Sequence, residues 1–390
     1  MISVNEALDH LFALVAPLSV ETVPLVQAYG RTLAQDVSAV RDQPPFAASA
    51  MDGYAVAAAD VAPGARFTVI GEAAAGHAFA GSVAKGEAAR IFTGAPLPDG
   101  ADWVVIQEDV TRSGDTITLN AHPETKPYVR PAGADFKTGD QINAPRVLST
   151  SDIALLAAMN IAQVPVTRRP VVAIIATGDE LVQPGETPGP DQIIASNSYG
   201  LAALVQSLGA QPRLLPIARD TVPALALAFD LAADADLIVT IGGASVGDHD
   251  LVGHVAQAKG MERAFYKIAM RPGKPLMAGR MGAAVMLGLP GNPVSAMVCG
   301  HVFLAPVILH MLGQGAAPAR RFTSPLQHAI GPNGPREHYT RAYYGPEGVT
   351  IFDRQDSALL TVLSQANCLA VRPVNDPARG RGDMIELIAL

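Results

Sequence analysis

The chain contains little of what several large protein classes depend on, beginning with cysteine. Only two cysteines, Cys299 and Cys368, occur in 390 residues, and neither belongs to a C-x-x-C pair. A disulfide scaffold and a zinc ribbon are therefore excluded, and two free thiols fit a reducing compartment. The sequence also lacks G-x-x-x-x-G-K-[ST], a strict G-x-G-x-x-G after a strand, and H-E-x-x-H. A classical kinase, a Rossmann dehydrogenase and a zinc protease lose support accordingly.

Basic residues are also few relative to acidic ones. The chain has 28 Lys and Arg against 36 Asp and Glu, a formal net charge of -8, and no Lys/Arg block. Attraction to the phosphates of nucleic acid therefore has no electrostatic basis, and we expect no nucleic-acid partner. An anionic ligand would need a local cluster of basic residues to hold it against the overall field.

Long unbroken hydrophobic runs are scarce as well, although hydrophobic residues make up 49% of the chain. The most apolar stretch, MVCGHVFLAPVILHML (297–312), is interrupted by His, Gly and Pro. It is shorter than the ~20 residues that a membrane span needs, so it predicts a buried helix. The N-terminal stretch has the spacing of an amphipathic helix and lacks the basic start of a secretory signal. We therefore expect a cytoplasmic protein with no membrane partner.

The pattern of apolar residues changes four times along the chain and predicts a multidomain α/β plus β fold. Strands alternate with helices over 169–318, which predicts a central doubly wound α/β domain with a mainly parallel sheet. Short strands and Gly, Pro and Asp turns over 39–140 predict an inserted β-rich domain. Helical patterns over 1–38 and 141–168 predict a discontinuous, mainly helical domain around it. Short strands over 319–390 predict a C-terminal all-β domain, β-barrel-like in shape.

Two glycine-containing stretches follow predicted strands of the α/β domain. TIGGASVGDHD (240–250) combines three glycines with Asp248 and Asp250, and ATGDEL (176–181) repeats the arrangement. Glycines let backbone N–H groups converge on an anion, and the carboxylates suit a Mg²⁺ ion that accompanies a phosphate. From spacing alone, a tight strand-to-helix turn explains TIGGASVGDHD as well as a ligand site does. For ATGDEL, an ordinary helix start is the better explanation.

Two further stretches carry the groups that an oxyanion needs. KIAMRPGKP (267–275) places Lys267, Arg271 and Lys274 within eight residues, where Pro and Gly force an irregular backbone. Such a cluster in an acidic protein fits phosphate or oxyanion binding, although a solvated surface loop has the same composition. GLPGNPVSAM (288–297) is a turn entering a helix, where Asn292 or Ser295 either contacts a ligand or only caps the helix.

Three stretches of the predicted β-rich domain read as turns when each is taken alone. They are SAMDGYAV (49–56), IFTGAPLPDGADWVVIQED (91–109) and RPAGADFKTGD (130–140). In order along the chain, SAMDGYAV, IFTGAPLPDGADWVVIQED, ATGDEL, SNSYGL, TIGGASVGDHD, MRPGKP and GLPGNPVSA resemble the MoeA-type molybdopterin molybdotransferases, the family that includes the C-terminal half of gephyrin. The resemblance covers nearly the whole chain and is weakest beyond about residue 320.

The resemblance implies a transferase of molybdenum cofactor biosynthesis. Its substrates would be adenylylated molybdopterin and molybdate, its cofactor Mg²⁺, and its products AMP and molybdenum on the pterin dithiolene. It implies an elongated four-domain homodimer whose active site lies between the α/β domain of one subunit and the β-rich domain of the other. A molybdopterin adenylyltransferase and molybdoenzyme chaperones would be further partners. The sequence does not distinguish molybdate from tungstate.

Site residues follow from the family's motifs position by position. The catalytic positions that match are Asp52, Thr93, Asp135, Glu180, Asp220, Asp250, Lys267 and Lys274. The matching substrate-binding positions are Thr177, Gly178, Ser196, Asn197, Gly242, Gly243, Ser245, Gly247, Arg271, Pro290, Asn292, Ser295 and Arg341, and the metal positions are Asp220, Asp248 and Asp250. Arg271 stands where many members have Lys, which replaces a point charge with a planar fork.

Two other functions remain open from the sequence. One is molybdopterin adenylylation by ATP, because the TGDEL and GGASVG loops also resemble that family, whose members are a single α/β domain. The other is a non-catalytic carrier or scaffold for the cofactor. The additional domains and SAMDGYAV argue against the adenylyltransferase, and a scaffold would tolerate loss of the acidic residues.

Overall fold

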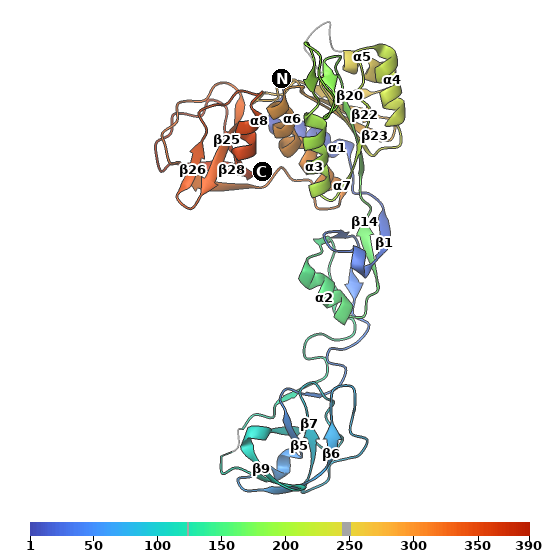
Figure 1. Ribbon diagram of the computed structural model, residues 1–390, viewed down its shortest axis with the longest axis vertical. Coiled ribbons are helices and arrows are strands. Elements are labelled where there is room, and N and C mark those ends of the chain that lie inside the picture. Colours follow the sequence, from blue (N-terminus) through green and yellow to red (C-terminus); the bar gives the residue numbers. More distant parts are fainter. Residues whose placement is uncertain (123–124, 244–250) are drawn as a thin grey trace.

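The computed structural model of the protein describes residues 1–122, 125–243 and 251–390. These residues form a multidomain α/β plus β architecture that is elongated (Figure 1). An α/β unit and a C-terminal β unit lie side by side at one end, and a small unit around β14 and α2 occupies the middle. A β-rich unit, with β5, β6, β7 and β9, forms the opposite end.

The α/β unit is built on a six-stranded sheet whose first four strands are parallel. Its order is β18 (Gln211–Leu214), β15 (Val171–Ala176), β19 (Leu237–Ile241), β23 (Ala284–Leu289), β22 (Met277–Met281) and β20 (Glu262–Tyr266). β22 runs antiparallel to both of its neighbours, β23 and β20. Runs such as VVAIIA and LIVTI are buried on both faces, which explains why they read as continuous apolar segments. The C-terminal ends of β15, β19 and β23 meet at one edge of the sheet, where ligands bind in folds of this kind.

Helices cover both faces of this sheet. One face packs against α1 (Val4–Leu14), α3 (Asn197–Ser207), α6 (Pro293–Cys299) and α7 (Ala305–Met311). The other packs against α4 (Val222–Leu231) and α5 (Leu251–Ala258). Helix α6, a π-helical turn (Gly300–Leu304) and α7 form one 19-residue segment with the length and hydropathy of a membrane span. Its residues are 78% buried within the protein, so it is a core helix, as the sequence predicted.

The expectation of a mainly helical discontinuous domain is wrong in two respects. Helix α1, which begins with a Ser3–Glu6 capping box, packs into the α/β core and not against the middle unit. The middle unit is a four-stranded sheet of β1 (Val20–Pro24), β14 (Gln163–Thr167), β2 (Thr32–Leu33) and β13 (Arg146–Val147), with η1 (Leu25–Gln27) and one helix, α2 (Thr150–Ala158). The stretches VETVP and QVPVT pair antiparallel across about 140 residues of sequence, a pairing that neither stretch reveals alone.

The β-rich unit is inserted into the middle unit through two paired connections. Its sheet has the order β8 (Trp103–Ile106), β5 (Gly53–Val56), β7 (Glu87–Ile91), β6 (Arg66–Ala73), β10 (Thr116–Leu119) and β9 (Val110–Ser113), with η2 (Ala58–Asp60) and η3 (Gln107–Asp109). β4 (Ala48–Ser49) pairs with β11 (Val129–Arg130), and β3 (Val37–Ser38) pairs with β12 (Gln141–Ile142). The chain therefore enters and leaves the unit along one two-stranded ribbon.

The sheet of the C-terminal unit includes one strand, β21, from the α/β part of the chain. Its order is β21 (Met270–Arg271), β25 (Glu337–Gly345), β27 (Cys368–Arg372), β28 (Met384–Ala389) and β24 (Arg321–Pro325), with β26 (Gly348–Ile351) beside β25 and α8 (Leu360–Gln365) alongside. A bridge between Leu326 and Val349 links the end of β24 back to β26. The strands thus enclose a small apolar core that contains Ala342 and Ala370.

Candidate functional site

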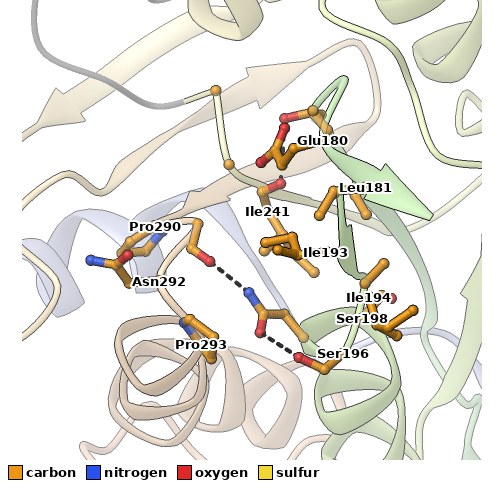
Figure 2. A pocket seen from close by; sticks show the side chains of 18 of the residues that line it. Glu180, Leu181, Ile193, Ile194, Ser196, Ser198, Ile241, Pro290, Asn292 and Pro293 are labelled. Carbon is orange, nitrogen blue, oxygen red and sulfur yellow. Dashed lines mark hydrogen bonds between the residues drawn. The ribbon is translucent and has the colours of Figure 1, made fainter. Parts of the chain in front are cut away.

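A cavity of about 590 Å³ opens where β15, β19 and β23 end and where α3 and α6 begin. In Figure 2, Glu180 lies at the opposite end of its lining from Pro293 and Ser196. The lining contains ten of the predicted site residues: Thr177, Gly178, Glu180, Ser196, Asn197, Asp220, Gly242, Gly243, Pro290 and Asn292. The sequence therefore located this edge of the sheet and the three turns that form it.

The glycines of the cavity are required by close backbone packing. Gly242 and Gly243 have φ values of +92° and +65°, in the left-handed region that favours glycine. A Cβ on Gly243 would lie 2.2 Å from Cγ2 of Val252, and a Cβ on Gly242 would lie 2.9 Å from the carbonyl oxygen of Thr177. Side chains are excluded here, so the backbone itself forms this wall of the cavity.

Carboxylates gather at one side of the cavity, and within the described residues no ion pair joins them to a cation. Asp220 and Glu180 line it, and the Asp220 N–H donates to Oδ1 of Asp179 at 3.2 Å. Burial, followed by the charges of Asp179 and Glu180, raises the pKa of Asp220 above its ordinary value. Arg219 donates to the carbonyl oxygen of Asp179 at 2.6 Å and so ties this turn to the next. Asp179, Glu180 and Asp220 thus bring three carboxylates to this side of the cavity, with Arg219 as the cation that contacts the turn.

Amide groups join the opposite walls of the cavity. Asn197 at the start of α3 donates from Nδ2 to the carbonyl oxygen of Gly291 at 2.7 Å, and Ser196 donates to Oδ1 of Asn197 at 3.4 Å (Figure 2). Asn292 donates to Oγ of Ser357 at 3.2 Å, which connects the α/β unit to the C-terminal unit. Ser295 is 4% exposed and does not line the cavity, so its predicted ligand contact has no support in the structure.

The predicted basic residues lie beside the cavity and not in its lining. Lys267 has a φ of +71°, and its Nζ lies 4.9 Å from the ring centroid of Tyr266. Arg271 belongs to β21 and pairs with His338 of β25. Lys274 precedes Pro275, which does line the cavity, and its carbonyl oxygen accepts from the Ile268 N–H at 3.1 Å. Their roles toward a substrate remain predictions.

Arg341 is a cation without a charged partner in the hydrogen bonds and ion pairs of the described residues. It is 0% exposed on β25, and its Nη2 donates to the carbonyl oxygen of Asp356 at 2.9 Å. Its Nε and Nη1 are buried and have no hydrogen-bond partner in the described part of the chain. Burial lowers the pKa of Arg341, and the charge of Arg271 lowers it further, while Asp356 acts in the opposite direction. A buried guanidinium with two unpaired nitrogens is costly to the fold, and an oxyanion is the kind of ligand that would pair with it.

Asp52 and Thr93 belong to the β-rich unit, which lies at the far end of the same chain from the α/β unit (Figure 1), and Asp135 lies in the ribbon that leads to it. The structure brings two of them together: Oδ1 of Asp52 accepts from the N–H of Thr93 at 2.8 Å and from its hydroxyl at 2.7 Å. These bonds lower the pKa of Asp52, and Arg90 contributes less. Asp135 donates its N–H to the carbonyl oxygen of Gln43 at 2.9 Å, in the ribbon that leads to the unit.

Four predicted residues, Ser245, Gly247, Asp248 and Asp250, lie outside the described residues. Within the described ranges, no group of three or more His, Cys, Asp or Glu side chains is arranged to hold a metal ion. Of the predicted metal ligands, only Asp220 is therefore placed. It faces the cavity together with Glu180, which was predicted as catalytic and not as a ligand.

Sequence reasoning missed the apolar and C-terminal parts of the lining. Leu181 and Ile193 come from a small parallel pair, β16 (Leu181–Val182) and β17 (Ile193–Ile194). Ile193 remains 58% exposed, which is unusual for isoleucine and fits a wall that receives a flat apolar ligand. Ala358 enters from the C-terminal unit beside Ser357. Isoleucines and an alanine carry no chemical signal in a sequence.

Three family models match the chain in succession. They describe the MoeA N-terminal region (domain I and II) over residues 2–160, a probable molybdopterin binding domain over 173–310, and the MoeA C-terminal region (domain IV) over 323–390. A molybdopterin molybdenumtransferase from Nostoc is 36% identical over 100% of this chain and 94% of its own. One from Haemophilus influenzae is 34% identical over 91% of this chain and 90% of its own.

Solved structures agree with this match. A molybdopterin biosynthesis MoeA protein from Pyrococcus horikoshii superposes with a TM-score of 0.87 at 30% identity, covering 100% of this chain and 99% of that one. A second structure from the same organism gives a TM-score of 0.85 at 27% identity, with 100% of both chains covered. The likeness therefore extends over all four units of the architecture.

Proposed function

This chain belongs to the MoeA family of molybdopterin molybdenumtransferases, and from that membership we propose that it uses the adenylylated form of molybdopterin and releases AMP. The transfer of molybdenum to molybdopterin is the activity named for its relatives. The observation that carries the proposal is the cavity at the strand ends, which has an acidic side with Glu180 and Asp220 and an apolar wall with Leu181 and Ile193.

The cavity offers the ring of such a substrate matching groups. Leu181, Ile193 and Ile194 form an apolar wall for a flat ring, and Asn197 and Asn292 carry amides that recognise ring nitrogens and oxygens. Molybdate is a tetrahedral oxyanion, and we assign it to Arg341, which is buried outside the lining and whose Nε and Nη1 have no hydrogen-bond partner in the described residues. We assign Lys267, Arg271 and Lys274 to the phosphate side, because they lie on the segment that leads to Pro275 in the lining.

Mg²⁺ fits the chemistry of the acidic side of the cavity. Glu180 and Asp220 supply hard oxygen ligands, and burial together with the charges of Asp179 and Glu180 raises the pKa of Asp220, a cost that a bound cation would relieve. A bound Mg²⁺ would offset the charge of a phosphoanhydride and polarise its oxygens. The residues of the chain hold the ligands in place: Arg219 fixes the Asp179 turn, and Gly242 and Gly243 let the backbone pack closely against Thr177 and Val252.

Mg²⁺ is expected to stabilise the wild-type protein and to leave the Asp220→Asn variant unaffected. At ten times its dissociation constant, a bound ion adds about 1.4 kcal/mol, a shift of a few degrees in Tm. The ion binds the carboxylate form, so the shift is expected to shrink as pH falls through the raised pKa of Asp220. Without Mg²⁺, Asp220 binds its proton more tightly in the folded than in the unfolded chain, so wild type loses stability as pH rises through that pKa and the Asn variant does not.

Differential scanning fluorimetry with and without Mg²⁺, over a pH series, measures these shifts. Asp115→Asn, an 88% exposed carboxylate in the β-rich unit, is the matched control and should respond as wild type does. An equal Mg²⁺ shift in Asp220→Asn and wild type would remove Asp220 from the ion site.

A homodimer with a shared active site is the second part of the proposal. Asp52 and Thr93 are held together but lie far from the cavity of their own chain (Figure 1). The middle unit and its ribbon expose several apolar side chains, which a partner subunit would cover: Val20, Val26, Tyr29, Val40 and Val147. A two-fold arrangement would bring the β-rich unit of one subunit to the cavity of the other. We place the reaction in the cytoplasm, with a molybdopterin adenylyltransferase as supplier and a molybdoenzyme chaperone as recipient.

Purified protein with adenylylated molybdopterin, Mg²⁺ and molybdate is expected to release AMP and to form pterin-bound molybdenum in equal amounts. Glu180→Gln is expected to lower both by about 100-fold, because it removes a charge from the side that faces the anhydride. Anion exchange chromatography of AMP and mass spectrometry of molybdenum measure the two products. Binding of the substrate without AMP would indicate a carrier, and consumption of ATP without molybdate would indicate an adenylyltransferase.

A further inference from the structure

Arg90 stands at the centre of a contact network on β7 of the β-rich unit. Its Nη1 donates to the carbonyl oxygen of Gly53 at 3.0 Å, and its Nη2 donates to Oε1 of Gln107 at 2.7 Å. The guanidinium also lies over two aromatic rings, 5.1 Å from the centroid of Tyr54 and 4.7 Å from that of Phe92. A planar cation that makes four contacts at once is fixed in position and fixes its neighbours.

Each of these contacts adjoins the Asp52–Thr93 pair. Gly53 follows Asp52 in the sequence, Phe92 precedes Thr93, and the N–H of Gln107 donates to the carbonyl oxygen of Asp52 at 3.1 Å. Arg90 thus links the three segments that surround the pair, namely β5, the turn after β7, and η3. β5 lies so close to β8 that a Cβ on Gly53 would be 2.0 Å from the carbonyl oxygen of Val105, so this position requires glycine.

The pair itself is arranged to accept hydrogen bonds. The hydroxyl of Thr93 donates a hydrogen bond to Oδ1 of Asp52, which leaves the hydroxyl oxygen and Oδ2 of the carboxylate able to accept hydrogen bonds. Such a pair suits N–H donors of a ring or a metal-bound water, and it repels phosphate. Its geometry depends on the two segments keeping their spacing.

We propose that Arg90 is a positioning residue for the transfer reaction: it holds Asp52 and Thr93 in the arrangement in which the β-rich unit meets the substrate. This inference rests on the proposed function, because it takes Asp52 and Thr93 as substrate contacts. Arg90 itself touches no reacting atom. Its effect is transmitted through Gly53, Phe92 and Gln107.

The charge of Arg90 gives the proposal a second, electrostatic consequence. Among the described residues, Arg90 from β7 is the charged group that acts on Asp52, while the neutral Thr93 supplies the hydrogen bonds; Glu108 of η3 accepts a hydrogen bond from Gln107. These bonds lower the pKa of Asp52 most, and Arg90 lowers it further. Removal of the guanidinium is therefore expected to raise the pKa of Asp52 and to move the acidic limb of the pH–rate profile to higher pH.

Arg90→Gln and Arg90→Lys separate geometry from charge. Arg90→Gln is expected to lower kcat by about 10- to 100-fold with a smaller change in KM, and to shift the acidic limb upward. Arg90→Lys keeps the cation but loses the fork, so it is expected to restore the acidic limb while kcat stays low. Arg112→Gln is the matched control, an arginine of the same unit that donates to the carbonyl oxygen of Gly114 and should behave as wild type.

Titration of ¹³C-labelled aspartate in the full-length protein reads the pKa of Asp52 without any turnover, with Asp52→Asn for assignment. If the wild-type enzyme releases no AMP, the proposed function is contradicted. The titration still tests the role of Arg90 in that case, because it needs no turnover. An active wild type with Arg90→Gln matching Arg112→Gln, or an unchanged pKa of Asp52, would overturn the positioning role. If Arg90→Gln fails to fold, Arg90→Lys decides the case: a kcat equal to that of wild type rejects the role.

Discussion

Replacement of Arg341 by methionine is expected to reduce molybdate-dependent turnover by about 100- to 1,000-fold while Tm stays the same or rises. The side chain is fully buried, and two of its three nitrogens have no hydrogen-bond partner in the described residues. Removal of a buried, unpaired cation relieves a desolvation cost, so the loss of one bond to Asp356 is offset. Most arginine substitutions that abolish function also destabilise the fold, and the opposite outcome identifies a group kept for a ligand.

Arg321→Met is the matched control for this prediction. Arg321 lies in the same unit and pairs with Glu337 at 3.0 Å and with Glu386 at 2.8 Å. Its loss is expected to lower Tm and to spare turnover at permissive temperature. Molybdate titration by calorimetry, together with AMP release, measures the functional effect in each variant. Undiminished molybdate affinity in Arg341→Met would assign the oxyanion to another group.

Two inactive variants are expected to restore each other when their subunits are mixed. Asp52→Asn removes a group of the β-rich unit, and Glu180→Gln removes a group of the cavity, so each homodimer lacks a complete site. In a shared-site dimer, half of the randomly assorted molecules are heterodimers with one intact site of two. Recovery of about a quarter of wild-type turnover is therefore expected.

Mixing under dissociating conditions followed by an AMP assay measures this recovery. A mixture of Glu180→Gln with Asp220→Asn is the control, because both residues belong to the same cavity and no heterodimer contains an intact site. Turnover in the control mixture equal to that of the test mixture, or no recovery in either, would show that the β-rich unit does not act across the dimer.

The strand-to-helix alternation of the α/β unit was predictable because its evidence is local. Runs such as LIVTI are apolar on both faces, and a glycine turn follows each strand that reaches the cavity. The three turns at Thr177, Gly242 and Pro290 were therefore found without any knowledge of the tertiary structure. Family resemblance added the residues of the β-rich unit, which local patterns had explained as ordinary turns.

The remaining features depend on contacts that no single stretch encodes. The apolar stripe of α1 shows that the helix is covered, but not that the sheet of the α/β unit covers it. β1 and β14 pair with the whole inserted unit between them in the sequence. The entropy cost of closing so long a loop does not depend on the residues of either strand, so neither strand predicts the pairing. The burial of Arg341 was equally hidden, because its sequence neighbours YT and AYY resemble those of an exposed strand.

The two-stranded ribbon between the middle and β-rich units has a consequence for how such a protein could arise. β3 and β12 run side by side where the chain enters and leaves, so the two cut ends of an excised unit would be separated by one strand spacing, about 4.8 Å. A short turn would close that gap without disturbing either neighbour. Insertion of one coding segment into another requires such a junction, because only the turn of one hairpin has to be opened to receive the inserted domain. The β-rich unit thus has the topology of an acquired module, carried on a hairpin that was already there.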